Sequence, residues 1–319
     1  MLTSRKTPRV LPLTALALAS ALGLAACGGS DGKSGGGKAE VVASFYPMAW
    51  LAGKVGGDQA SVQTLTKPGA EPHDLELTPR QIADVGKADL AVYVRGVQPA
   101  VDDAVGKHAK NKSLDAVAAV KTLPPPAEDE HGHEGEGEEG GHGEAELSFD
   151  PHVWLDPSRM ATIATALGGK LAAADSKNAA AHKSRATALA TELNKLDQEF
   201  KDGLKNCKQK TMVTSHAAFG YMAERYGLKQ ISIAGVDATN EPSPKRLAEL
   251  THEIKENKAT TVFTETLVSP KVAEALARSA GVKTAVLDPI EGLKPGSSDD
   301  YLSVMRKNLQ VLKPALGCS

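Results

Sequence analysis

The 319-residue sequence has no excess of basic residues, because 37 lysines and arginines stand against 39 aspartates and glutamates. The basic residues form no stripe, which argues against nucleic acid as a partner. Sulfur is scarce, with three cysteines and six methionines, so a metal site built from soft sulfur ligands is not expected. The His-Glu-x-x-His segment of many zinc hydrolases is absent. A zinc hydrolase on an α/β scaffold is therefore a disfavoured alternative.

The N-terminus carries an apolar run that is too short and too abruptly ended for a good membrane-spanning helix. Three basic residues precede an Ala/Leu-rich stretch at 11–26, and small residues lead directly into Cys27. This order is typical of an export signal, and the cysteine matches a bacterial lipobox. We expect a lipoprotein signal peptide at 1–26 and a lipid on Cys27 that anchors the protein to the outer face of the cytoplasmic membrane. An ordinary signal peptide with an incidental cysteine is the alternative.

The remaining chain divides by composition into four parts. Residues 27–38 are almost wholly Gly, Ser, Lys and Asp, which is typical of a flexible tether. An N-terminal lobe is expected at 39–157, a connecting helix at 158–205 and a C-terminal lobe at 206–319. The connecting segment contains no proline and is amphipathic, with one break expected near 175–178.

Short strand-like runs alternate with helical patterns in both lobes, which predicts an α/β fold with a mostly parallel sheet flanked by helices in each lobe. In the first half, strands are expected at 41–45, 61–65 and 90–94, and helices at 47–55 and 78–87. In the second half, strands are expected at 211–214, 230–233, 261–263 and 284–287, and helices at 217–226, 244–256, 270–280 and 299–313. A rigid connecting helix then leaves one cleft between the lobes.

Three histidines and one aspartate form the candidate metal site: His73, His152, His216 and Asp288. Three of the four lie at or shortly after the end of an expected strand, and ligands of open α/β sheets bind outside the carboxyl ends of strands. Three imidazoles and a carboxylate suit tetrahedral zinc. With all four positions filled, no open site is left to activate water, which favours carriage over hydrolysis. The helical-pattern histidines His108, His182 and His252 are interpreted as solvated.

The segment 124–146 begins with three prolines and contains nine acidic residues, three histidines and no basic residue. Such a composition is typical of a disordered, solvated insertion. Its histidines, His131, His133 and His142, are interpreted as an auxiliary loop that collects metal weakly near the cleft or senses its abundance. A purely solubilising acidic loop is the alternative.

Cys207 and Cys318 are the two cysteines that remain besides Cys27. An even pair in an exported protein predicts a disulfide. Because the closed loop is long, the bond could contribute about 4–5 kcal/mol. Two free buried thiols are the alternative.

Three segments resemble the signature segments of one family, the zinc/manganese solute-binding lipoproteins of ABC transporters (cluster A-I, ZnuA/TroA-like). They are 71–79, 150–157 and 214–221. The resemblance runs from about Val41 to Leu316 in the same order and spacing. It implies that the same three histidines bind the metal, with Asp288 in the fourth position and Glu71 or water as less favoured substitutes. Glu265 is interpreted as a residue that orients an imidazole, or else as a helix-start carboxylate.

The resemblance also implies a function: a monomeric, non-enzymatic lipoprotein that captures Zn(II) and delivers it to the permease of an ABC transporter. Manganese-binding relatives tend to carry Glu in place of His216, and manganese prefers oxygen ligands. Zinc-binding relatives tend to carry an acidic, His-rich insertion, as residues 128–146 do here. A manganese-binding protein of the same type and a metal-binding surface adhesin are the alternatives.

Overall fold

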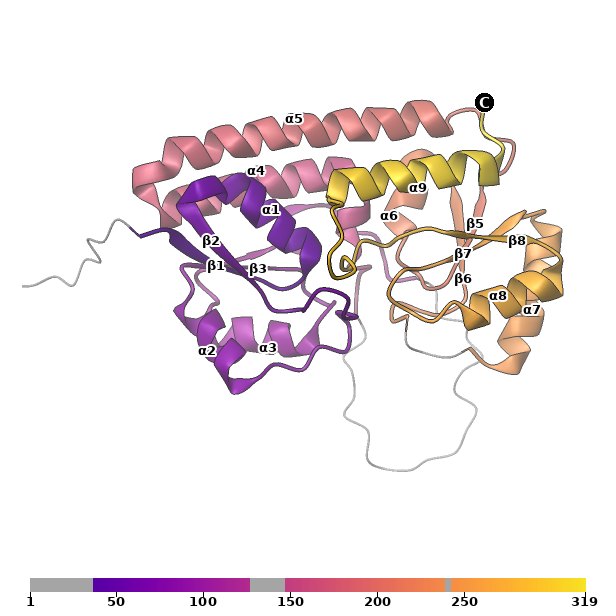
Figure 1. The fold of residues 1–319 in the computed structure, drawn as a ribbon, viewed down its shortest axis with the longest axis horizontal. Coiled ribbons are helices and arrows are strands. Elements are labelled where there is room, and N and C mark those ends of the chain that lie inside the picture. Colours follow the sequence, from indigo (N-terminus) through magenta and orange to yellow (C-terminus); the bar gives the residue numbers. More distant parts are fainter. Residues whose placement is uncertain (1–36, 127–146, 239–241) are drawn as a thin grey trace, which may run out of the picture. The chain divides into compact units, whose positions relative to one another are not determined.

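A computed structural model describes residues 37–126, 147–238 and 242–319. Residues 37–319 form one compact unit, which contains two four-stranded sheets in which every strand pair is parallel. Helices flank both sheets, so the predicted α/β fold of two lobes is confirmed (Figure 1). Among the helices of the described ranges, none is both long and apolar enough to cross a bilayer.

The first lobe has the strand order β2-β1-β3-β4. Its elements are β1 (Ala39–Ala43), α1 (Tyr46–Gly56), β2 (Ala60–Thr64), α2 (Pro79–Lys87), β3 (Leu90–Tyr93), α3 (Pro99–His108) and β4 (Ser113–Asp115). Val41 and Val42 of the inner strand β1 point to opposite faces and both are buried, as expected for a parallel strand covered by helices on both sides. The predicted elements of this lobe are confirmed, whereas α3 and β4 were not predicted.

The second lobe has the strand order β6-β5-β7-β8. Its elements are β5 (Thr211–Thr214), α6 (Gly220–Tyr226), β6 (Lys229–Ser232), α7 (Pro244–Glu256), β7 (Thr261–Thr264), α8 (Lys271–Ala280), β8 (Lys283–Val286) and α9 (Tyr301–Leu316). All of them were predicted to within about three residues at their ends, a margin close to the usual uncertainty of helix boundaries. In both lobes, a loop follows the carboxyl end of each strand.

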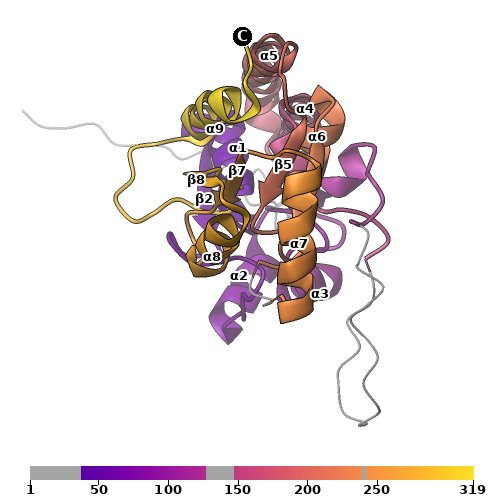
Figure 2. The same cartoon turned by 90° about the vertical axis from the view of Figure 1, so that its right-hand side faces the viewer.

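The connecting segment is a helical hairpin rather than one continuous helix. It consists of α4 (Pro157–Ala174), a 3-10 turn η4 (Ser176–Asn178) and α5 (Ala179–Leu204), with the break where it was predicted. The two helices pack side by side in both views (Figures 1 and 2). Gly168 of α4 permits this close approach, because a Cβ at that position would collide with the Cβ of Ala186 on α5.

α5 is the element that bridges the two lobes. Its 26 residues span about 39 Å at the α-helical rise. It contacts α1 of the first lobe and both α6 and α9 of the second, and Figure 1 shows it running over both. The apolar stripe of α5, including Leu193, Leu196 and Phe200, is fully buried by these contacts. A packed helix of this length makes a stiff connection.

His182 is buried, so its interpretation as a solvated residue was wrong. Its Nε2 lies 3.0 Å from Asp175 Oδ2, and its Nδ1 lies 3.0 Å from the Arg185 guanidinium. Arg185 in turn donates hydrogen bonds to the last two carbonyls of α1. The hairpin thus supplies partners for the carbonyl groups that a helix end leaves unpaired. His108 and His252 are exposed, as expected.

Cys207 and Cys318 form the predicted disulfide. The bond joins the residues that follow α5 and α9, and a short antiparallel bridge pairs the two cysteines in the backbone as well. The C-terminal end of the chain is therefore attached to the bridging helix.

Candidate metal centre

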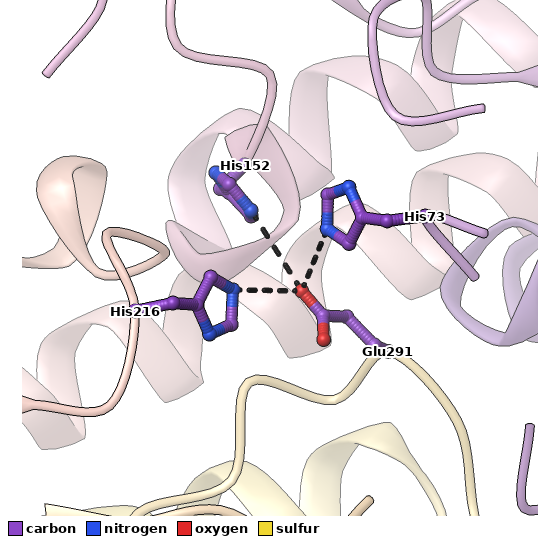
Figure 3. A group of neighbouring side chains, drawn as sticks. All are labelled: His73, His152, His216 and Glu291. Carbon is purple, nitrogen blue, oxygen red and sulfur yellow. Dashed lines mark hydrogen bonds and ion pairs between the residues drawn. The ribbon is translucent and has the colours of Figure 1, made fainter. Parts of the chain in front are cut away.

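Four side chains meet in the structure: His73, His152, His216 and Glu291. Their potential ligand atoms all lie within 4.8 Å of one another. One oxygen of Glu291, Oε1, is central to the group (Figure 3). It lies 3.2 Å from Nε2 of His216, 3.4 Å from Nε2 of His73 and 3.7 Å from Nε2 of His152.

Each of the four side chains comes from a different loop. His73 lies between β2 and α2, and His216 lies two residues after β5. Glu291 lies between β8 and α9, and His152 immediately precedes a 3-10 turn, η3 (Val153–Leu155), that leads into α4. Loops at the carboxyl ends of parallel strands meet at one edge of a sheet, and here the edges of both sheets contribute to one centre.

The loop that carries His73 is held at its far end by the start of α2. Thr78 forms a capping box with Gln81, a pairing that satisfies two backbone N–H groups at a helix start. The side chain of Gln81 also donates a hydrogen bond to the carbonyl of Leu65, just after β2. The loop therefore leaves the sheet and returns to a point close to where it began.

Two of the histidines are oriented in the same way by a carboxylate. The backbone N–H and ring Nδ1 of His152 lie 2.9 and 2.8 Å from Oδ1 of Asp150. The backbone N–H and ring Nδ1 of His216 lie 3.1 and 2.8 Å from Oε1 of Glu265. A carboxylate on Nδ1 holds the imidazole in the tautomer whose Nε2 is free to bind a metal. Glu265 thus occupies the position of an orienting residue, and Asp150 is a second one that sequence analysis did not identify.

The centre is buried and leaves several polar atoms without a hydrogen bond. His152, His216 and Glu291 are at most 1% exposed, and the His73 side chain is 6% exposed. Within the described part of the chain, Nε2 of His73, Nε2 of His152 and Oε2 of Glu291 make no hydrogen bond. Buried polar atoms without partners are costly, and a cation bound by these atoms would remove that cost. The donor set therefore fits a metal ion.

The electrostatics of the group are dominated by burial and by the mutual attraction of imidazole and carboxylate. Burial lowers the pKa of His216, but the charges of Glu291 and Glu265 outweigh it and raise that pKa well above its usual value. Burial likewise lowers the pKa of His73, and its contact with Glu291 raises it overall. For His152 burial prevails and the pKa is lowered. Burial raises the pKa of Glu291, but His216 and His73 lower it overall.

Asp288 was expected as the fourth metal ligand, but it is not among the four converging side chains. Its Oδ1 accepts a hydrogen bond of 2.7 Å from the N–H of Ile290, and its Oδ2 accepts one of 3.0 Å from Thr266 Oγ1. One oxygen therefore holds the turn that precedes Glu291, and the other is bonded to the loop that follows β7. Glu291 was missed because it lies five residues beyond the end of β8, and the only sequence signal for it was a second carboxylate in the same loop.

Glu71 lies beside the group without belonging to it. Its Oε1 accepts a hydrogen bond of 3.3 Å from the backbone N–H of His73, and its Oε2 is buried without a partner among the described residues. Burial and the charge of Glu291 raise the pKa of Glu71 to about 7. Cys27 and the loop histidines His131, His133 and His142 lie outside the described residues, so their roles stay predictions.

Two parallel-sheet lobes bridged by a long helix, with this buried centre where their loops meet, define a two-lobed binding protein with a histidine-rich metal centre. Residues 41–315 match the ZnuA family, described as zinc-uptake complex component A, periplasmic, and the chain belongs to this family.

Individual relatives are similar over most of the chain. The zinc-binding lipoprotein AdcA of Streptococcus pneumoniae R6 is 39% identical over 305 residues, which cover 93% of this chain and 59% of AdcA. The chain thus spans about three-fifths of the length of that relative. The high-affinity zinc uptake system protein ZnuA of Bacillus subtilis 168 is 35% identical and is covered to 93%. The crystal structure of Zn(II)-bound AdcA from Streptococcus pneumoniae has a TM-score of 0.72 at 36% identity, covering 88% of this chain and 58% of that one.

Proposed function

We propose that this protein captures Zn(II) outside the cytoplasm and delivers it to the permease of an ABC transporter. The observation that carries the proposal is the buried group of three imidazoles and one carboxylate, whose Nε2 and Oε atoms converge on one point. Family membership and relatives named as zinc-binding or zinc-uptake proteins support the same function.

The donor atoms of the group support zinc over manganese. Ligands at about 2.0–2.1 Å in a tetrahedron lie roughly 3.3 Å from one another. The separations of Glu291 Oε1 from the imidazoles of His216 and His73, 3.2 and 3.4 Å, are close to that value, and the separation from His152 is 3.7 Å. Manganese prefers six ligands that are mainly oxygen, whereas three of the four atoms here are nitrogen.

The same arrangement supports binding rather than catalysis. Catalytic zinc sites keep a position open for water, and here four protein atoms are placed to fill all four positions.

We further propose that the protein is a monomer held on the outer face of the cytoplasmic membrane by a lipid on Cys27, after removal of residues 1–26. In this proposal residues 128–146 form an auxiliary metal-collecting loop.

The test of the function is a calorimetric competition between zinc and manganese on residues 37–319. We expect one zinc ion to bind tightly per chain and to be displaced by manganese only at a large excess. Tighter binding of manganese would overturn the metal while leaving a transport role. Weak binding of both metals would contradict the transport role itself and favour a surface-adhesion function.

Zinc affinity is expected to fall as the pH is lowered. Zinc binds neutral imidazole, so protons compete with it. The pKa values of His216 and His73 are raised in the structure, so these residues take up protons at a higher pH than an ordinary histidine. The affinity should therefore already decline at a pH above the ordinary histidine pKa of 6.5, by roughly tenfold per pH unit for each proton released. Calorimetry in buffers of different ionisation enthalpy counts these protons, and an affinity unchanged between about pH 8 and pH 6 would contradict the ligand set.

Deletion of residues 128–146 is expected to leave the affinity for one zinc ion unchanged within about twofold, because all four converging side chains lie outside the deleted segment. The deletion should remove only additional weak binding by the loop histidines. Chelator competition and zinc titration of the deleted and intact proteins measure the two effects separately. A large loss of the tight site would show that the loop supplies a ligand.

A further inference from the structure

The segment that presents Glu291 contains an unfavourable backbone conformation. Ile290, directly before Glu291, has a φ of 59° and a fully buried side chain. A positive φ is a strong outlier for a β-branched residue, and such conformations persist only where the surroundings enforce them. Because the chain direction at Ile290 sets where Glu291 points, whatever holds this turn also sets the position of the carboxylate.

The side chain of Asp288 holds the turn directly. It accepts the N–H of Ile290 at 2.7 Å, so the strained residue is bonded to a side chain two positions earlier. Its second oxygen accepts the hydroxyl of Thr266 at 3.0 Å, which fixes the carboxylate against the loop that follows β7. Asp288 can hold the turn only if its own backbone is fixed.

Asn308 of α9 fixes that backbone from both sides. Its Oδ1 accepts the N–H of Asp288 at 2.9 Å, and its Nδ2 donates to the carbonyl of Asp288 at 2.7 Å. The Asn308 amide thus pairs with Asp288 as a neighbouring strand would. Asn308 is 2% exposed, although asparagine is rarely buried without such a need. Among the described residues, no other side chain bonds both the N–H and the carbonyl of Asp288.

The same segment is also tied to the loop that carries His152. The indole N–H of Trp154 donates to the carbonyl of Pro289 at 2.7 Å, and the hydroxyl of Tyr301 donates to the carbonyl of Trp154 at 2.6 Å. The turn before Glu291 is therefore placed relative to a second histidine of the centre, and not only relative to its own lobe.

We propose that Asn308 is a positioning residue for the metal centre: through Asp288 it holds the strained turn at Ile290 that aims the Glu291 carboxylate at the three imidazoles. The inference rests on the proposed function, in which Glu291 is a zinc ligand. The side chain of Asn308 bonds to the backbone of Asp288 and, within the described part of the chain, makes no hydrogen bond to the four converging side chains, so its contribution to zinc affinity is indirect and passes through the turn that carries Glu291.

The test is a double-mutant cycle of Asn308→Asp and Glu291→Gln on residues 37–319. Asn308→Asp keeps the shape and the acceptor but replaces the Nδ2 donor by an oxygen that faces the carbonyl of Asp288. Alone, it is expected to weaken zinc binding about tenfold, in the range found for residues that orient metal ligands. In the Glu291→Gln background it should weaken binding less than about twofold, because the group it positions no longer binds as a carboxylate.

Two further variants keep the test decisive. Asn257→Asp is the matched control, because Asn257 also donates through Nδ2 to a backbone carbonyl, that of Glu253 at the end of α7; its zinc affinity should be unchanged. Thr266→Val removes the hydrogen bond from the Thr266 hydroxyl to Asp288 Oδ2 and keeps the side-chain volume. If the Asn308→Asp protein does not fold, Thr266→Val takes its place in the cycle. The Co(II)-loaded proteins report the geometry of the centre through the d–d absorption of a tetrahedral ion, which the Asn308 variant should alter and the control should not.

The outcomes distinguish the positioning role of Asn308 from the proposed ligand role of Glu291. Equal losses of affinity in both backgrounds would show that Asn308 supports the fold and not Glu291, and would overturn the inference. An unchanged affinity and Co(II) spectrum for the single variant would overturn it as well. A Glu291→Gln protein that binds zinc as tightly as the natural chain would instead overturn the proposed ligand role of Glu291.

Discussion

A protein carrying His216→Ala is expected to bind zinc at least about 100-fold more weakly than the natural chain. Loss of a residue that merely orients a ligand costs about 10- to 100-fold, and loss of a ligand should exceed it. His216 is fully buried, so water has little access to replace its Nε2. The substitution also leaves Glu265 and Glu291 without the imidazole that lies between them. Chelator competition measures the affinity.

His252→Ala is the matched control, because it removes the same side chain from an exposed position on α7, where the imidazole pairs, among the described residues, with Glu256 in the next turn. Its zinc affinity should equal that of the natural chain. Similar losses for both variants would mean that the measured zinc binding does not come from the buried centre. Full retention of affinity by His216→Ala would exclude His216 as a ligand.

Removal of the disulfide by the double substitution Cys207→Ser and Cys318→Ser is expected to lower the free energy of unfolding by about 4–5 kcal/mol. The bond closes a loop across a sequence separation of 111 residues, and a cross-link restricts the unfolded chain more strongly the longer that loop is. For a protein of this size the loss corresponds to a midpoint of thermal unfolding roughly 10 °C lower. Calorimetry of the two proteins in the absence of zinc gives the difference.

The control for this prediction is the zinc affinity of the folded double variant. The bond joins the residues after α5 and α9, whereas the four converging side chains lie in loops at the carboxyl ends of strands and before α4. Affinity should therefore change less than about twofold. An unfolding free energy equal to that of the natural chain would show that α9 is held to α5 by packing alone.

The strands and three of the four central side chains were predictable from the sequence because each gives a local signal. The buried strands are short apolar runs between turn residues, and a histidine after such a run points to the carboxyl edge of a sheet. His216, two residues after β5, follows this rule directly, whereas His73 lies in the longer loop after β2 and is also marked by the signature segment at 71–79. His152 lies instead before a helix that begins with a proline, after a turn whose acidic residue, Asp150, orients its ring.

The fourth side chain was not predictable because its position depends on backbone conformation. Asp288 directly follows the predicted strand, so strand-end reasoning selects it. The structure uses that carboxylate to hold the turn at Ile290, and the chain then delivers Glu291 to the centre. Only the positive φ at Ile290 distinguishes the two carboxylates. The sequence does not predict this conformation, because glycine or asparagine is usual at a residue with positive φ and neither occurs at this position.

The hairpin and its buried histidine escaped prediction for a related reason. An amphipathic pattern shows that a helix has a buried face but not what covers it, so α4 and α5 were expected to run on as one connector. His182 lies among lysine and alanine residues and so has the pattern of an exposed residue. It is buried because the hairpin places it against the end of α1. Strand β4 has one buried residue, Leu114, which is too little for a periodic signal.

The most direct test of the zinc centre is a crystal structure of zinc-loaded residues 37–319, with anomalous diffraction collected on both sides of the zinc absorption edge. We predict one strong anomalous peak bound by Nε2 of His73, His152 and His216 and by a carboxylate oxygen of Glu291, at about 2.0–2.2 Å. Asp288 should remain bonded to Ile290 and Thr266. A peak bound by Asp288 in place of Glu291, or by the histidines of residues 128–146 alone, would contradict the account.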